Sequence, residues 1–113
     1  MSDVTREPLG TFPIQPQKPV DRVEVKRLTL PPGGKTGLHT HPGPTICYIV
    51  EGAVIVKVRG GEERRYGVGE AVREPGGQVM EKFDNASNEV PAVFIATYLL
   101  NDADHQVIHM LEE

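Results

Sequence analysis

Two histidines one residue apart, His39 and His41, are the residues of this chain with the clearest potential for chemistry. Side chains alternate between the two faces of an extended strand, so both imidazoles would project from one face and could reach a single ion. In a helix the same spacing would turn the two rings about 200° apart. Pro42 and the glycines before the pair favour a short strand between turns. The spacing therefore predicts a metal site, with a pair of packing or solvated histidines as the alternative.

The elements that would position these histidines are short strands separated by turns rich in glycine and proline. We expect strands at 21–30, 45–50, 53–58, 62–66, 71–73, 79–83 and 90–100. Turn signals such as Gly60-Gly61 recur at a spacing of about 8 to 12 residues, which is typical of β-sandwiches and barrels. No segment shows a convincing helical pattern. The sequence therefore predicts an all-β sandwich or barrel.

Three of these segments carry more specific expectations. The apolar residues of 21–30 change parity after Val25, so we expect a bulge or burial of both faces there. The near-continuous apolar run of 92–100 predicts burial on both faces. For the tail, we prefer an edge strand at 106–111 over a helix, in which His105 and His109 would share a face.

Length and charge restrict the class of protein. A chain of 113 residues is expected to form one domain, since it is too short for two. The 12 basic and 16 acidic residues give a net charge of −4 and form no basic stripe, so nucleic acid is not an expected partner. Cys47 is the single cysteine, which excludes an intrachain disulfide. We find neither a signal peptide nor a membrane-spanning run, and expect a soluble, cytoplasmic protein.

The first 20 residues differ in composition from the rest. Four prolines among them favour an extended arm over a helix. The arm is either a frayed terminus or, through Phe12 and Ile14, a segment that docks on the body or on a partner subunit. We therefore divide the chain into a Pro-rich arm at 1–20 and a single barrel domain at 21–113.

Two spaced motifs resemble the paired signatures of the cupin superfamily, in its small single-domain form. The first motif is Gly33, five residues, His39-x-His41 and then Gly52, and the second is Gly69, five residues, Pro75-x-Gly77. The resemblance covers residues 33 to 85 and implies a double-stranded β-helix, the jelly-roll barrel of that family. It also implies that His39 and His41 bind one divalent ion inside the barrel.

Half of the ion's usual ligands are replaced in this chain. The resemblance implies a glutamate where Thr45 stands and a third histidine where Met80 stands. The closing asparagine of the second motif falls at Asp84, with Asn85 one residue late. A hydroxyl in place of a carboxylate weakens the affinity for hard ions, while a thioether suits softer ones such as copper.

Several residues could complete the site. By strand parity Cys47 would face the interior, giving a soft set of His39, His41, Met80 and Cys47, although buried sulfur side chains are also ordinary packing residues. Glu81 could replace the missing carboxylate only through a one-residue slip of its strand. His105 or His109 could add a nitrogen, but surface positions are the default for both.

The resemblance implies a protein that binds a divalent transition metal (Cu, Zn, Ni, Fe or Mn) and acts on or binds a small organic molecule. Oxygenase, isomerase and lyase chemistry are the implied reactions. Thr45, Cys47, Glu81, Tyr48 and Tyr98 are the candidate pocket residues, and the last three are candidates for proton transfer. The alternative is a non-catalytic barrel that binds or senses a small ligand through a degenerate, metal-free site. The resemblance also implies a homodimer.

Overall fold

The computed structural model describes residues 3–14 and 17–112, and within these ranges its regular secondary structure consists of strands only. The strands are β1 (Arg22–Leu30), β2 (His39–Thr40), β3 (Thr45–Glu51), β4 (Ala53–Val58), β5 (Arg64–Gly67), β6 (Ala71–Glu74), β7 (Met80–Asn85), β8 (Ala92–Leu100) and β9 (His109–Met110). No helix long and apolar enough to cross a bilayer occurs among the described residues. The all-β expectation is confirmed.

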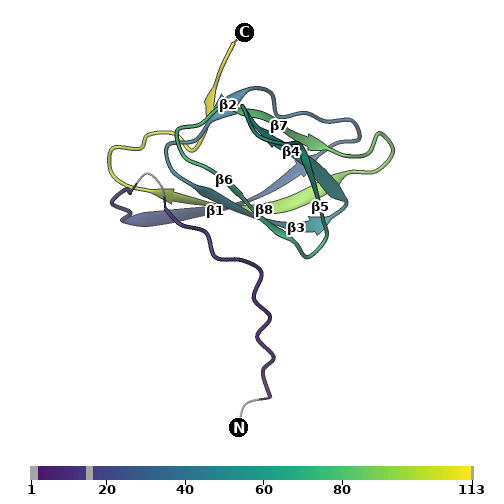
Figure 1. Cartoon of the computed structure of the whole chain (residues 1–113), viewed down its shortest axis with the longest axis horizontal. Helices are drawn as coiled ribbons and strands as arrows, with labels where there is room; N and C mark the ends of the chain where they lie inside the picture. The colour runs from purple at the N-terminus through teal and green to yellow at the C-terminus, as the bar shows by residue number, and fades with distance from the viewer. Residues whose placement is uncertain (1–2, 15–16, 113) are drawn as a thin grey trace.

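The strands form two antiparallel sheets that face each other (Figure 1). The first sheet has the order β1-β8-β3-β6, and the second has the order β5-β4-β7-β2-β9. Every pairing joins strands that are distant in sequence or linked by a tight turn, as in β3 with β8 and β4 with β5. The inner faces of both sheets supply the core, which is the arrangement of a β-sandwich.

The core is an apolar cluster between the sheets. Phe83 of β7 and Phe94 of β8 pack across it with ring centroids 4.5 Å apart. Ile49, Val54 and Leu100 are buried in the same cluster. His39 and His41 are buried in the same interior. The packing of this core therefore sets the distance between the two sheets where the histidines lie.

β1 corrects one expectation about the apolar pattern. Its pairing with β8 runs without a shift from Arg22 opposite Leu100 to Leu30 opposite Ala92, so there is no bulge. Val23 and Val25 are 54% and 61% exposed, so the parity change does not reflect burial of both faces either. Both valines lie on the outer face of this edge strand. Of the residues of β1, only Leu30 is fully buried in the core.

β8 is central in its sheet but is fully buried on only one face. Its residues alternate strictly between buried and half-buried, beginning with the buried Ala92 and ending with the buried Leu100. The expected burial of both faces is therefore wrong in part. The outward residues are half-covered because β1 and β3 flank β8 on both sides.

Two glycine-containing turns bring the ends of the two motifs together. A Cβ at Gly76 would lie 2.7 Å from the Cα of Gly43, so only glycine permits this close approach. Next to it, the backbone N–H of Gly77 donates a hydrogen bond to the carbonyl of His41 at 2.9 Å. These contacts hold the loop after β2 against the loop after β6.

The tail returns to the barrel as a short strand. β9 pairs with β2, and the N–H of Leu111 donates to the carbonyl of Leu38 at 3.0 Å. The strand is shorter than the predicted 106–111, because only His109 and Met110 satisfy the pairing. The tail thereby lies beside the histidine strand.

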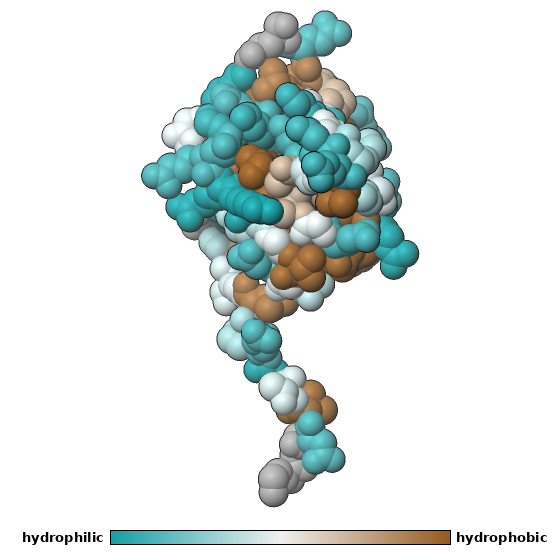
Figure 2. Space-filling view, turned by 90° about the vertical axis from the view of Figure 1, so that its right-hand side faces the viewer, coloured by the Kyte–Doolittle hydropathy of each residue, from teal (hydrophilic) through white to brown (hydrophobic). Residues whose placement is uncertain are grey.

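The arm projects away from the sheets (Figures 1 and 2). Residues 3–14 and 17–20 form no strand. The arm is attached to the body by the Arg73 guanidinium, which donates to the carbonyl of Pro13 at 2.8 Å, and by an ion pair between Lys18 and Asp104. Val4, Leu9 and Ile14 are exposed along it.

Candidate metal centre

The two histidines converge on one carboxylate oxygen. The Nε2 atoms of His39 and His41 lie 2.9 Å and 2.6 Å from Oε2 of Glu74. All three side chains are buried, and the two imidazole rings pack edge to face with centroids 4.9 Å apart. The structure therefore brings the predicted pair together with a carboxylate that sequence reasoning missed.

Glu74 reaches the site through the pairing of β3 with β6. It lies directly opposite Thr45, the position where the motif implies a glutamate, so the carboxylate comes from the neighbouring strand. Its burial, alternating with the half-buried Arg73, follows from the parity of β6. In the sequence, Glu74 is marked only by its position just before Pro75 of the second motif. The register of β6 against β3, which brings it to the histidines, cannot be read from local sequence.

Backbone carbonyls fix the tautomer of both rings. The Nδ1 atom of His39 lies 2.7 Å from the carbonyl oxygen of Gly37, and the Nδ1 atom of His41 lies 2.7 Å from that of Val107. A carbonyl oxygen only accepts, so each Nδ1 carries the proton. A ring that is also protonated at Nε2 donates from there to Oε2 of Glu74, whereas a neutral ring presents its Nε2 lone pair to a metal ion. This orientation of ligand histidines by carbonyl groups is typical of metal sites.

The contacts between the histidines and Glu74 shift the pKa values of His39 and Glu74. Burial lowers the pKa of His39, but hydrogen bonds to Glu74 and Gly37 outweigh it, and the pKa is raised overall. Burial raises the pKa of Glu74, but the two histidines outweigh it, and the pKa is lowered overall. The carboxylate of Glu74 is therefore held ionised. Its negative charge is balanced either by protons on the histidines or by a metal ion bound between the three side chains.

The donor atoms fit a small metal ion. The three ligand atoms lie within 4.8 Å of one another. Donors bound at about 2.1 Å from one ion are roughly 3 Å apart, close to the 2.9 Å and 2.6 Å between each Nε2 atom and Oε2 of Glu74. Two imidazoles and one carboxylate are a donor set of catalytic zinc sites and of non-haem iron sites, both of which leave positions open.

Met80 and Cys47 surround this cluster. Met80 is fully buried and lies directly opposite His39 in the pairing of β2 with β7. The Cys47 thiol donates a long hydrogen bond of 3.8 Å to Oε1 of Glu74, the carboxylate oxygen that faces away from the histidines. Burial raises the pKa of Cys47 well above its usual value, so the thiol stays protonated. Among the described residues Cys47 is not part of the three-residue ligand group.

Thr45 and Tyr98 also face the interior. They lie opposite each other in the pairing of β3 with β8, so Glu74, Thr45 and Tyr98 form one row on the inner face of the first sheet. The Tyr98 ring lies 5.8 Å from the ring of His41. Burial raises the pKa of the Tyr98 hydroxyl to about 12, so it remains a hydrogen-bond donor.

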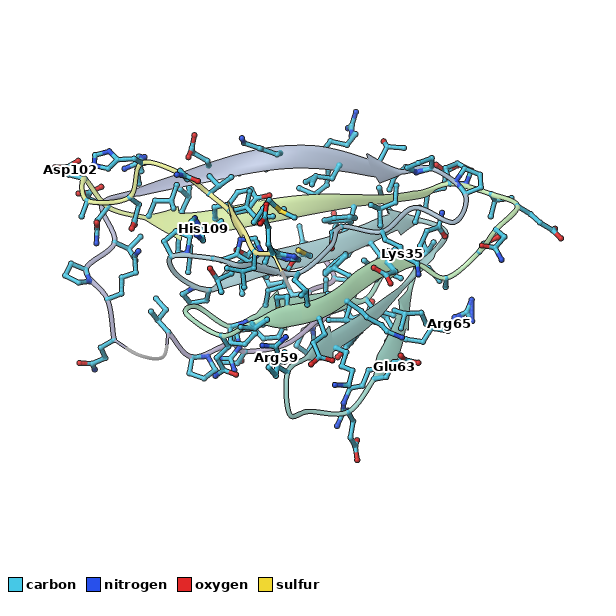
Figure 3. All side chains as sticks on the ribbon, turned by 90° about the horizontal axis from the view of Figure 1, so that it is seen from above. Lys35, Arg59, Glu63, Arg65, Asp102 and His109 are labelled. Atoms are coloured by element: carbon cyan, nitrogen blue, oxygen red, sulfur yellow. The ribbon has the colours of Figure 1, made fainter. Side chains whose placement is uncertain are left out.

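The structure does not bring Glu81 or Tyr48 to the site. A bulge does occur at Glu81, where Lys57 faces Lys82 and Val58 faces Met80. The bulge directs Glu81 outward, however, where it forms ion pairs with Lys57 at 2.8 Å and Arg59 at 3.2 Å. Figure 3 labels Arg59 below the ribbon of β7, away from the histidines. Tyr48 is 40% exposed on the outer face of β3. Both expectations for the pocket are thereby corrected.

The tail histidines lie at the surface near the site. His105 and His109 are exposed, and Figure 3 shows His109 on the tail strand. Together with His41 and residues 103–106 they line a cavity of about 280 Å³. The cavity therefore lies between the tail and the histidine loop, beside His41.

Comparison with known proteins supports the architecture. The family model described as "Cupin domain" matches residues 26–98. No curated protein sequence matches significantly.

Solved structures share the fold at low sequence identity. A cupin-like protein from Thermotoga maritima is similar over 79% of this chain, with a TM-score of 0.66 and 24% identity. A double-stranded β-helix protein from Klebsiella pneumoniae is similar over 88% of this chain and 82% of its own, with a TM-score of 0.65 and 18% identity. A variant of oxalate decarboxylase from Bacillus subtilis is similar over 79% of this chain, with a TM-score of 0.66 and 21% identity. The expected double-stranded β-helix is therefore confirmed.

The share of each neighbour that is matched differs. This chain covers 64% of the Thermotoga protein and 24% of the decarboxylase. At these identities the likeness concerns the fold.

Proposed function

Because this chain belongs to the cupin family, we propose that it binds a divalent transition metal through His39, His41 and Glu74 and acts on a small organic molecule at that site. The observation that carries the proposal is the convergence of both Nε2 atoms on one oxygen of Glu74. Since each Nδ1 donates to a carbonyl, both rings are already in the tautomer that binds a metal.

The donor set also narrows the choice of ion. One carboxylate and two imidazoles suit Fe²⁺, Mn²⁺, Ni²⁺ or Zn²⁺ better than they suit Cu⁺, which favours sulfur ligands. Such an ion, when bound, supplies a Lewis acid that polarises a carbonyl or activates water or O₂. We therefore place Met80 beside the ion as a packing residue and not among its ligands, a change from the soft set of His39, His41 and Met80 predicted from the sequence.

The protein's own groups would then prepare the site for a substrate. The Tyr98 ring lies beside that of His41 and keeps its hydroxyl proton, and the Cys47 thiol donates to the outer oxygen of Glu74. The buried position of the cluster excludes bulk water and strengthens electrostatic interactions within it. Oxygenase, isomerase and lyase reactions of a small oxygen-bearing molecule are compatible with this arrangement.

The proposal is tested by elemental analysis of protein purified without a metal-affinity tag. We expect close to one metal ion per chain in the wild type, and its loss in the His39→Ala/His41→Ala double variant. The matched control is His105→Ala/His109→Ala, which removes two exposed imidazoles close to the same cavity and should retain the metal. Absence of metal in the wild type, also after addition of Fe²⁺, Mn²⁺, Ni²⁺ and Zn²⁺, would contradict the proposal and favour the metal-free ligand-binding barrel.

We also propose that two copies associate through the outer face of the first sheet, in a cytoplasmic setting. Val23, Val25 and Tyr48 are exposed apolar residues on that face, and the arm exposes Val4 and Leu9. Contact with a second copy would cover these apolar side chains. Light scattering at micromolar concentration should give the mass of a dimer, and the mass of a monomer would contradict this part of the proposal.

A further inference from the structure

The hydroxyl of Thr45 is buried without a partner. Thr45 is 1% exposed, and its Oγ1 is the buried side-chain oxygen or nitrogen that lacks a hydrogen-bond partner among the described residues. A buried hydroxyl without a hydrogen bond destabilises a protein by about 1–3 kcal/mol. Such a group in a native fold calls for an explanation, and a partner that it gains only when the site is filled is one of them.

Its neighbours show where this hydroxyl lies. Thr45 stands between Glu74 and Tyr98 in a row across β6, β3 and β8, on the face that carries the metal ligand. Tyr98 in turn packs against His41. Thr45 therefore lies on the same inner face as Glu74, in the strand beside the one that supplies the carboxylate.

The charge of the site indicates what the hydroxyl would bind. A divalent ion with two neutral imidazoles and one carboxylate leaves a net charge of about +1 on the site. Among the described buried residues no lysine or arginine adds to this charge, and Glu74 is the buried acid. An anionic oxygen ligand would neutralise the site, and neutral hydroxyl donors such as Thr45 and Tyr98 suit its oxygen atoms.

We propose that Thr45 is a specificity-determining residue, whose hydroxyl donates a hydrogen bond to a small carboxylate bound at the open position of the ion. This inference rests on the proposed function, because it requires the ion. It assigns Thr45 a contact with the substrate and not with the metal. It also names carboxylates as the class of molecule that the site takes.

The test uses Co²⁺ as a spectroscopic ion and acetate as the probe. Full-length wild type, Thr45→Val and Thr45→Ser are loaded with Co²⁺, and acetate is titrated while the visible absorption of the ion is recorded. Valine keeps the shape of threonine without the hydroxyl, whereas serine keeps the hydroxyl. We expect equal Co²⁺ affinity in all three proteins. The acetate affinity should fall about tenfold or more in Thr45→Val and be retained in Thr45→Ser.

The metal-free proteins give an independent readout. The denaturation midpoint of metal-free Thr45→Val should equal or exceed that of the wild type, because the substitution removes an unpaired buried hydroxyl. A clearly lower midpoint would show that the hydroxyl has a partner within the fold, and would overturn the proposal even if Thr45→Val could not be loaded.

The remaining outcomes separate this inference from the proposed function. Unchanged acetate affinity in Thr45→Val would overturn the role of Thr45 and leave the metal site standing. A fall in Co²⁺ affinity itself would make Thr45 a metal ligand, which also overturns the inference. Failure of the wild type to bind Co²⁺ would overturn both.

Discussion

Replacing Glu74 by glutamine should lower the affinity for the metal ion by at least about 100-fold, because changes to groups that only orient a ligand already cost 10–100-fold. The substitution removes the negative charge that lies 2.6 Å and 2.9 Å from the two Nε2 atoms. The fold should survive, since the new amide group can donate hydrogen bonds to both Nε2 lone pairs. Competition titration with a chromophoric chelator would measure the affinity.

Glu81→Gln is the matched control for this variant. Glu81 has the same side chain, lies on the outer side of β7 away from the cluster, and pairs with Lys57 and Arg59. Its removal should leave the metal affinity unchanged. If Glu81→Gln lost the metal and Glu74→Gln kept it, the site would be built around the other carboxylate.

Replacing Phe83 by alanine should have the largest effect on stability. Phe83 is fully buried, packs on Phe94, and lies in the same strand as Met80, which faces His39. Truncation of a buried phenylalanine lowers the free energy of unfolding by about 3–5 kcal/mol, out of about 5–15 kcal/mol for a typical domain. Urea denaturation followed by circular dichroism would measure the change.

An exposed valine provides the comparison for Phe83. Val68 is 64% exposed in the turn after β5, and Val68→Ala should change the free energy of unfolding by less than about 0.5 kcal/mol. A loss of under about 1 kcal/mol in Phe83→Ala would mean that the ring does not fill the core between the sheets.

Most of the fold could be predicted from the sequence, because its turns are marked by residues with special backbone geometry. Gly52 has a φ of +72° between β3 and β4, and a Cβ there would lie 2.6 Å from the carbonyl oxygen of Pro91. Such a position accepts only glycine, so the break after Glu51 is visible in the sequence. The strand at 53–58 was predicted with the bounds that the structure has.

The candidate site could be predicted only in part, because local spacing does not determine strand register. The one-residue spacing of His39 and His41 was enough to place both rings on one face. Glu74 depends on the pairing of β6 with β3, and Tyr98 depends on the pairing of β8 with β3, both of which join distant segments. Replacement of the motif glutamate by Thr45 therefore looked like the loss of a ligand, whereas the structure places a carboxylate on the adjacent strand.

The bulge at Glu81 also shows that local sequence does not determine which way a side chain points. A one-residue slip was foreseen as the condition for turning Glu81 inward, and the slip is present. It nevertheless keeps Met80 and Phe83 in the core, because both large apolar side chains gain more from burial than a carboxylate does. The extra residue of the bulge is the one that stays outside.

The most direct test of the metal site is anomalous X-ray scattering from crystals of the metal-loaded protein, recorded on both sides of the absorption edge of the ion found by elemental analysis. We expect one strong anomalous peak between the Nε2 atoms of His39 and His41 and a carboxylate oxygen of Glu74. A peak bonded to the sulfur of Met80 or Cys47 without Glu74, or a peak away from all three residues, would contradict it.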